Sequence, residues 1–248
     1  MPLVSIDPGA AALALPGAAP SQRSTLSSWL AVSLVGLALL MAWDGSGLDL
    51  PLARWFGDTA GFAHRNDWLL TKVLHDGARN ASWALTALLA VMVLRPVGVM
   101  RRLSRRERIG LLLGVVASVV VMSLMKHAST TSCPWDLQEF GGTARYVSHW
   151  RWGLSDGGGG HCFPAGHASA GFAYLGGWFW LRRSAPRAAA VWLTAVVCLG
   201  LLLGGVQQLR GAHYMSHTLW TAWLCWTVSG AVWWLWHGRA RQAVAGTA

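Results

Sequence analysis

Polar clusters stand at three places between residues 126 and 217, each where an apolar run begins or ends. They span Lys126 to Asp136, Pro164 to His167 and Arg210 to His217. Ionisable groups beside lipid are costly and are usually retained for function. We therefore interpret the three clusters as parts of a single site.

The residue types in these clusters suit the binding and transfer of a multiply charged anion. Lys126 and Arg210 would supply positive charge. His213 and His217 would share one face of a helix, because residues four apart are neighbours there. Together with His167 they offer imidazoles that can act as nucleophile, base or acid. Fixed cations would stabilise the charge that develops in such a reaction.

The second cluster, Pro164-Ala165-Gly166-His167, leads directly into an apolar segment. The start of a helix presents unpaired N–H groups and the positive end of the helix dipole, and both favour an anion. We therefore expect the backbone around Ala165 and Gly166 to bind the anion and His167 to face it.

Two of the four cysteines, Cys133 and Cys162, lie in the same long link between apolar segments. On an extracytoplasmic, oxidising face such a pair would form a disulfide. The bond would hold the first cluster beside the second. The alternative is two free thiols that do not meet.

The elements that carry these clusters are long apolar segments in a chain that is 54% hydrophobic and 12% charged. Most are close to the roughly 17–25 residues that cross a bilayer. They lie at about 26–43, 82–100, 109–125, 168–181, 190–206 and 216–236. No segment alternates polar and apolar residues as a barrel strand does, and backbone groups in lipid must bond within their own segment. The expected fold is an all-α polytopic membrane protein with about six transmembrane helices in one bundle.

Arginine predicts the orientation of this bundle. Arginines cluster in the links at 101–108 and 182–187 and in the tail at 239–241, and the positive-inside rule places them in the cytoplasm. Both termini would then be cytoplasmic, and the three polar clusters would face outward from a bacterial inner membrane. The net charge of +10 suits anionic inner-leaflet lipids and requires no nucleic-acid partner.

The chain is expected to contain one folded domain. Residues 1–25, rich in Ala, Pro, Gly and Ser, are predicted to be a disordered cytoplasmic segment. Residues 26–238 form the predicted transmembrane domain, and residues 239–248 form a cytoplasmic tail.

The three clusters resemble the signature of the type 2 phosphatidic acid phosphatase superfamily of membrane phosphatases. That signature is a lysine, six residues and arginine-proline; then proline-serine-glycine-histidine; then arginine, five residues, histidine, three residues and aspartate. Lys126 with Cys133-Pro134, then Pro164 to His167, then His213 stand at matching positions in the same order. The likeness covers roughly residues 109–226.

This chain departs from the signature at four positions. Cys133 replaces the first arginine and Ala165 the serine, while Gln207 and His217 replace the second arginine and the aspartate. Other residues would have to supply the missing charges. The candidate cations are Arg210, Arg79, Arg145 and Arg151; Asp136 or Asp76 could orient His213, with His217 as a neutral hydrogen-bond acceptor.

The resemblance implies hydrolysis of a phosphate ester or diphosphate through a phosphohistidine, without a metal or other cofactor. His213 would attack phosphorus and His167 would protonate the leaving oxygen. Lys126, Arg210 and the N–H groups near Ala165 would hold the phosphoryl oxygens. With its site at the outer edge of the bilayer, the implied substrate is a phospholipid, isoprenoid or lipid A phosphate. Transfer of the phosphate to an acceptor lipid would use the same intermediate.

Two other classes of function stay open. His213 and His217, with His167 or His161, could bind zinc or haem, although Lys126 and Arg210 would oppose a bound divalent ion. Alternatively, the altered site could bind an anionic lipid or a partner without turnover.

Overall fold

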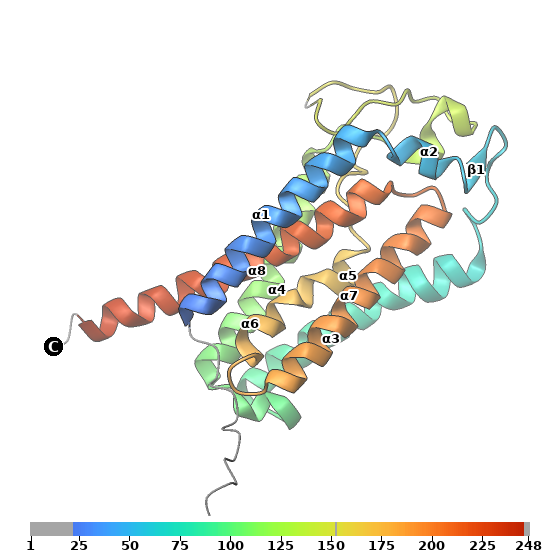
Figure 1. Ribbon diagram of the computed structural model, residues 1–248. Coiled ribbons are helices and arrows are strands. Elements are labelled where there is room, and N and C mark those ends of the chain that lie inside the picture. Colours follow the sequence, from blue (N-terminus) through green and yellow to red (C-terminus); the bar gives the residue numbers. More distant parts are fainter. Residues whose placement is uncertain (1–21, 152, 246–248) are drawn as a thin grey trace, which may run out of the picture.

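The computed structural model describes residues 22–151 and 153–245. Most of the predicted disordered segment at 1–25 and the last three residues of the predicted tail lie outside the described residues. The described chain is mostly helical, and its long helices run side by side (Figure 1). One short hairpin, of β1 (Gly57–Asp58) and β2 (Gly61–Phe62), is antiparallel.

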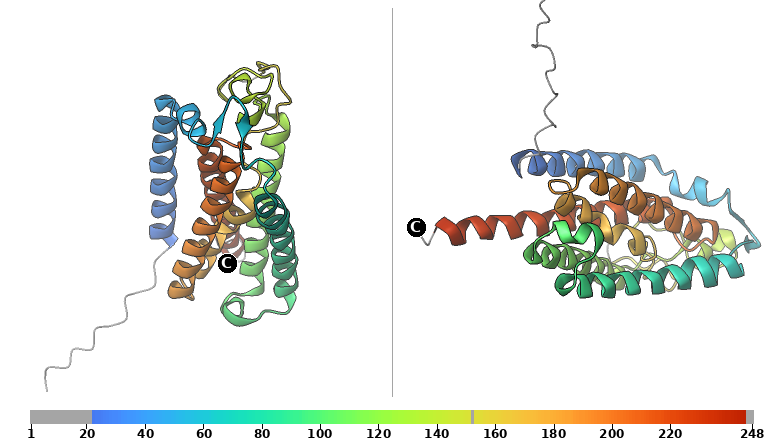
Figure 2. Two further views of the ribbon diagram at one scale, coloured as in Figure 1. Left: turned by 90° about the vertical axis from the view of Figure 1, so that its right-hand side faces the viewer. Right: turned by 90° about the horizontal axis from the view of Figure 1, so that it is seen from below.

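Five long helices build the bundle: α1 (Gln22–Ser46), α3 (Ala78–Leu94), α4 (Arg105–Ala128), α7 (Pro186–Leu209) and α8 (Met215–Ala245). Helix α8 packs against α1, α4 and α7. Figure 2 shows α1 along one side of the bundle and the pair of α3 and α4 along the other. Helix α8 continues to Ala245, seven residues past the predicted end of the transmembrane domain at 238.

Four of the described helices are long and apolar enough to cross a membrane. They are Thr25–Ser46, Leu69–Arg102, Arg105–Ala128 and Pro186–Leu209. By length and composition the chain is therefore an integral membrane protein, as the sequence indicated. The expected count of six is not confirmed.

The two other expected spans differ from these four for separate reasons. The segment predicted at 168–181 consists of three short helical pieces, α5 (Ser169–Phe172), η5 (Ala173–Gly176) and α6 (Gly177–Leu181). Together they are shorter than the roughly 17 residues that a span needs, and most of their side chains are buried in protein. Helix α8 is long enough, but its tryptophan, threonine and serine residues lower its mean hydropathy.

The main core lies among α4, α7, α8 and the short pieces α5 to α6. Phe172, Tyr174 and Phe179 are fully or almost fully buried there. Tyr174 also bonds to the α3 side chains Ser82 and Thr86, at 3.0 and 2.8 Å between oxygens. The residues that follow Pro164 are thus anchored to four of the long helices, α3, α4, α7 and α8, and their position is fixed from the inside of the bundle.

The turn between α7 and α8 is held by contacts from distant parts of the chain. Asp49 of α2 (Asp49–Ala53) accepts hydrogen bonds from the backbone N–H of Ser216, at 3.0 Å, and from its hydroxyl group. Gly211 has φ +73°, and a Cβ there would lie 2.3 Å from the Phe62 ring. The N–H of Trp135 donates to the Gly211 carbonyl, at 2.9 Å. The sharp turn therefore requires glycine and brings the first and third clusters together.

Candidate active site

The three polar clusters lie at one end of the bundle, and a disulfide joins the first of them to the segment that leads into the second. Cys133 and Cys162 form a disulfide with their Cα atoms 5.2 Å apart, which confirms the predicted pair. Beside it, the N–H of Cys162 donates to the Thr131 carbonyl at 2.9 Å, and the N–H of His161 donates to the Ser129 carbonyl at 2.8 Å. The first cluster is thus fixed against the segment that leads into the second.

His213 and His217 contact each other in the interior. Their Nδ1 atoms are 3.4 Å apart, and the two residues are only 4% and 1% exposed. Two nitrogens at this distance share a single hydrogen, so one imidazole donates and the other accepts. When His213 is the donor, its Nε2 keeps a free lone pair. This geometry suits the predicted role of His217 as a neutral acceptor in the place of the signature aspartate.

A metal would find few free ligands at this point. Cys162, His213 and His217 form a group of possible metal ligands whose ligand atoms lie within 4.8 Å of one another. However, the Cys162 sulfur is bonded to Cys133, and only a thiolate binds zinc well. The donor set that remains, two imidazoles in contact with each other, does not fit a resident metal.

His167 stacks on a histidine that the sequence reasoning did not identify. Its ring lies 3.5 Å from the ring of His75, centroid to centroid, at an angle of 28°. The Nδ1 of His75 lies 2.9 Å from Asp76 Oδ1. Asp76 also interacts with Lys72, at 3.3 Å, and with Arg79, at 3.9 Å. His75 therefore joins a short charged network to the second cluster.

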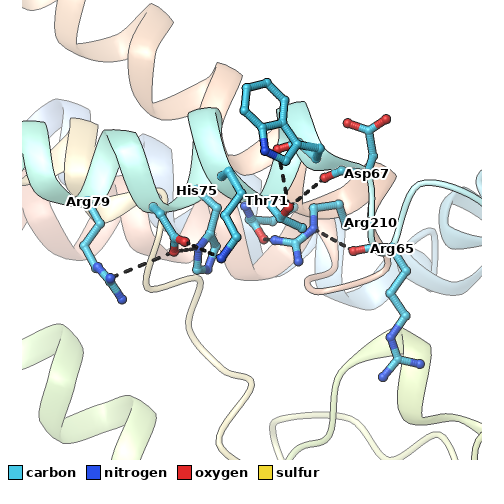
Figure 3. A network of polar contacts seen from close by, with 10 residues as sticks. Arg65, Asp67, Thr71, His75, Arg79 and Arg210 are labelled. Carbon is cyan, nitrogen blue, oxygen red and sulfur yellow. Dashed lines mark hydrogen bonds and ion pairs between the residues drawn. The ribbon is translucent and has the colours of Figure 1, made fainter.

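His75 was missed because the second helix starts earlier than its hydropathy suggests. The helical segment begins at Leu69 with the π-helix η1 (Leu69–Gly77), which continues directly into α3, whereas the apolar run begins at 82. Figure 3 shows Thr71, His75 and Arg79 along this helix. Their spacing of four was a helical signal in the sequence. π-Helical turns are often found at functional sites.

Arg210, a candidate for the missing arginine, is held in place by Gln207 and by the backbone of Arg65. It is 8% exposed; its guanidinium donates to the Gln207 side-chain oxygen at 3.0 Å and to the Arg65 carbonyl at 3.1 Å (Figure 3). Gln207, which stands at the signature arginine position, thus holds the arginine that lies three residues further on. The cation is fixed without being neutralised, because both of its partners are uncharged.

Lys126 lies directly beside the turn of the second cluster. A Cβ placed on Gly166 would lie 3.5 Å from Lys126 Cδ, so the lysine side chain runs along the backbone of this turn. On the other side of the turn, the N–H of Ala165 donates to the His217 carbonyl at 3.2 Å. Ala165 and Gly166 therefore connect Lys126 with the third cluster, but the Ala165 N–H is occupied and does not point to an open anion site as predicted.

Burial and neighbouring charges lower the pKa values of the histidines in this region. Burial, together with the charges of His75, Lys126, Arg210 and Arg79, lowers the pKa of His167 to about 3. Burial also holds the pKa of His213 well below its ordinary value, with added effects from Lys126, His217 and His167. The empty site therefore contains neutral imidazoles among fixed cations, an arrangement that attracts an anion.

Three of the candidates named from the sequence lie in the link and have other partners. Asp136 accepts a hydrogen bond from the N–H of Cys133 at 3.3 Å, within the short helix η3 (Pro134–Asp136). Arg145 and Arg151 contact the link through their backbones, to Asp156 and Ser148. Among the described residues, none of the three side chains has a contact with His167, His213 or His217.

A different residue of the link reaches the third cluster. The ring of His149 lies edge-on to that of His217, with centroids 5.9 Å apart. Its Nε2 is 3.3 Å from a carboxylate oxygen of Asp44 in α1. The sequence did not predict His149 or Asp44 as residues of the site, because the path of the link depends on these tertiary contacts.

A cavity opens between α3 and α4 beside His167. Its volume is about 350 Å³. Its polar lining consists of Arg79, Gly166, His167 and the hydroxyl residues Ser82, Thr86, Ser123 and Ser169. The rest is largely apolar, with Trp83 from α3 and Val115, Val116, Val119 and Val120 from α4. Trp83, Val116 and Val120 are exposed on the outside of the bundle, so the cavity is open toward the surface that four membrane-spanning helices would turn to lipid.

Comparison with known protein families fits this geometry. A family model described as the PAP2 superfamily matches residues 108–241, which is more than half of the chain. The chain belongs to the PAP2 superfamily. This confirms the resemblance that the three motifs indicated, and it supports a phosphatase-type activity. The match contains all three clusters but not His75 or Arg79, which lie before it. Comparisons with curated proteins and with solved structures found no match.

Proposed function

We propose that this PAP2 protein is a metal-independent phosphatase that removes phosphate from a lipid phosphate or diphosphate. The observation that carries the proposal is the position of Arg79 and His167 on the lining of a largely apolar cavity. Lys126 lies against Gly166 in the turn before His167, and the pair of His213 and His217 is joined to the same turn through the hydrogen bond from the Ala165 N–H to the His217 carbonyl. Phosphoryl transfer depends mainly on positioning and on compensation of charge. Fixed cations at this site would hold the phosphate group in position and compensate its negative charge.

In the proposed reaction, Nε2 of His213 attacks phosphorus and forms a phosphohistidine. The bond from phosphorus to the leaving oxygen breaks, and His167 donates a proton to that oxygen. Water then attacks the phosphohistidine, with His167 accepting its proton, and inorganic phosphate leaves. His217 accepts the hydrogen of His213 Nδ1 throughout, which keeps the attacking lone pair on Nε2.

His167 must acquire a proton before it can act as an acid. In the empty site its pKa is about 3, so it is neutral at pH 7. A bound phosphate group brings negative charge next to the ring, and nearby negative charge favours the protonated imidazole. Binding of substrate would therefore charge His167 at the moment when the acid is needed.

We assign a supporting role to the pair of His75 and Asp76. Stacking at 3.5 Å fixes the plane of the His167 ring, and Asp76 fixes His75 in turn. Lys126, Arg210 and Arg79 would hold the phosphoryl oxygens. His75 is thus a positioning residue that acts through His167.

The cavity supports a substrate with an apolar chain. Valines of α4 and Trp83 of α3 continue from the polar end at Arg79 and His167, which suits a phosphate group attached to an acyl or isoprenoid chain. Phosphatidate, isoprenoid diphosphates and lipid A phosphates all have this form. We further propose that the site faces the oxidising, extracytoplasmic side of a bacterial inner membrane, with both termini inside, because the disulfide lies at that end.

The test is release of phosphate by the purified full-length protein in detergent with EDTA. Phosphatidate, an isoprenoid diphosphate and a lipid A phosphate would be offered separately, with His213→Ala as the control. Release from at least one of them by the wild type but not by the variant is expected. Binding of these lipids without any release would contradict the proposal and support the binding function that the altered motifs leave open. Activity only after zinc is added would support the metal alternative.

A further inference from the structure

The end of the bundle opposite the histidines has an excess of positive charge that the protein itself does not neutralise. The links at 95–108 and 182–187 hold nine arginines and one acidic residue, Glu107. Glu107 is engaged in the capping box of α4, where it accepts from the N–H of Ser104 at 2.7 Å. Among the described residues, none of these arginines forms an ion pair.

Two of these arginines border a common cavity. Arg102 of η2 (Gly98–Arg102) and Arg187 of α7 lie on a cavity of about 900 Å³ between the two links. In Figure 1 this is the end of the bundle near α6, away from α2. Other arginines of this end have partners within the protein. Arg108, for example, donates to the carbonyls of Val93, Met100 and Leu103.

The same cavity has two uncharged features that favour an anion, a hydroxyl group without a partner and the start of a helix. The hydroxyl oxygen of Ser184 lines it and is buried without a hydrogen bond. Helix α7 starts at its edge, with no side-chain cap at Ala185 and no acidic residue in its first turn. The positive end of a 24-residue helix therefore adds to the field of the two arginines. All of these groups favour an anion, and the chain supplies none.

The surface next to the cavity indicates what the anion is attached to. Leu94, Val97 and Val191 are exposed large apolar residues, and they directly flank η2 and the start of α7. They belong to or adjoin helices that are apolar enough to cross a membrane. A ligand here meets positive charge on one side and an apolar helix surface on the other.

We infer that this cavity between η2 and the start of α7 binds the phosphate headgroup of an anionic phospholipid, separately from the active site. The phosphate lies between Arg102 and Arg187 and accepts a hydrogen bond from the Ser184 hydroxyl. The acyl chains lie over Leu94, Val97 and Val191. The bound lipid joins the link before α4 to the link before α7.

The test compares two double variants of the full-length protein in detergent. Arg102→Gln with Arg187→Gln removes both charges from the cavity. Arg101→Gln with Arg183→Gln removes the same charge from neighbouring residues that do not line it. Each protein is titrated with phosphatidylglycerol and with phosphatidylcholine, and bound lipid is counted by native mass spectrometry. Phosphatidylglycerol is a phosphodiester and is not a substrate for removal of a terminal phosphate.

Wild type should bind phosphatidylglycerol in preference to phosphatidylcholine. The cavity variant should bind it roughly tenfold more weakly or worse, and the control variant should stay within about twofold of wild type. Equal loss in both variants would show diffuse attraction to the whole arginine-rich end and would overturn the inference. Equal binding of the two lipids would overturn it as well. Displacement by millimolar inorganic phosphate would show that the site takes a soluble anion, which contradicts the lipid assignment.

Discussion

The two ends of the bundle both carry cations, but they hold them in different ways. At the histidine end Arg210 is buried and fixed by two uncharged acceptors, and Lys126 lies along a turn. At the other end Arg102 and Arg187 are exposed. A fixed, desolvated cation can compensate a charge that develops in a transition state without having to reorganise. An exposed cation contributes mainly to binding and orientation in the membrane. The comparison supports our proposal that the histidine end is the catalytic end.

The largest expected effect is the loss of the two imidazoles. His213→Ala and His167→Ala should each lower the rate of phosphate release by about 10²-fold or more, because each removes a chemical step. Arg101→Gln, at the opposite end, should leave the rate unchanged. Initial rates with the best lipid phosphate measure all three. Near-normal rates in both histidine variants would mean that the histidine end is no more important for catalysis than the arginine-rich end.

The next effect concerns the buried arginine. Arg210→Gln should lower kcat/KM by about 10²-fold, as expected for loss of one stabilising group in an enclosed site. Arg102→Gln makes the same change at an exposed position and should alter it by less than about twofold. Comparison of these two variants sharpens the contrast, since the same charge is removed once from a buried position at the histidine end and once from an exposed position at the other end. Similar values for the pair would mean that Arg210 acts through the overall charge alone.

A smaller effect is expected from the stacked pair. His75→Phe keeps a ring against His167 but cannot bond to Asp76, whereas His75→Ala loses both contacts. If stacking positions His167, the alanine variant should lose about tenfold in kcat and the phenylalanine variant should recover most of it, with KM little changed in either. Thermal unfolding of both variants serves as the control for folding. An equally low kcat in the two variants would contradict positioning by stacking.

The smallest expected effect is a shift of the acid limb of the pH–rate profile to lower pH. Because the pKa of His213 lies well below 6.5 and that of His167 is about 3, both imidazoles of the free enzyme are neutral from pH 7 down to well below 6.5. The profile of kcat/KM reports groups of the free enzyme, so its acid limb should lie below 6.5 after correction for ionisation of the substrate. A limb near 6.5 that belongs to the enzyme would contradict the burial of these rings.

The lowered pKa values of His167 and His213 also make the free energy of unfolding depend on pH. Below pH 6.5 the unfolded chain binds protons at these histidines while the folded chain does not. The free energy of unfolding should therefore decrease as pH falls from 6.5 toward 3 and should be independent of these two groups above that range.

Much of this site could be predicted from the sequence because its parts are local. The spacing of four between His213 and His217, the Pro164 to His167 turn and the pair of Cys133 and Cys162 are all short-range or compositional signals. The structure contains the predicted disulfide, and the match to the family model confirms the predicted family. Lys126 and Arg210 were also predicted as cations of the site, and both are among the charges that lower the pKa of His167.

The rest depended on packing that hydropathy does not record. The segment at 168–181 is as apolar as a span, but protein rather than lipid surrounds it, and composition does not distinguish the two environments. The polar start of the second helix at Leu69 placed His75 outside the apolar run. Asp136 and Asp76 were the groups predicted to orient His213, whereas the folded link brings a different residue, His149, to His217.

Direct detection of the phosphorylated intermediate is the most decisive measurement. The wild-type protein would be mixed with a lipid phosphate, quenched in base within the first turnovers and digested, and the peptides around residue 213 would be sequenced by mass spectrometry. We predict a base-stable, acid-labile phosphoryl group on His213, with none on His217 or His167, and none anywhere in the His213→Ala protein. Phosphate release at the full rate with no phosphoryl group on His213, or with the group on another histidine, would contradict the assignment on which the mechanism depends.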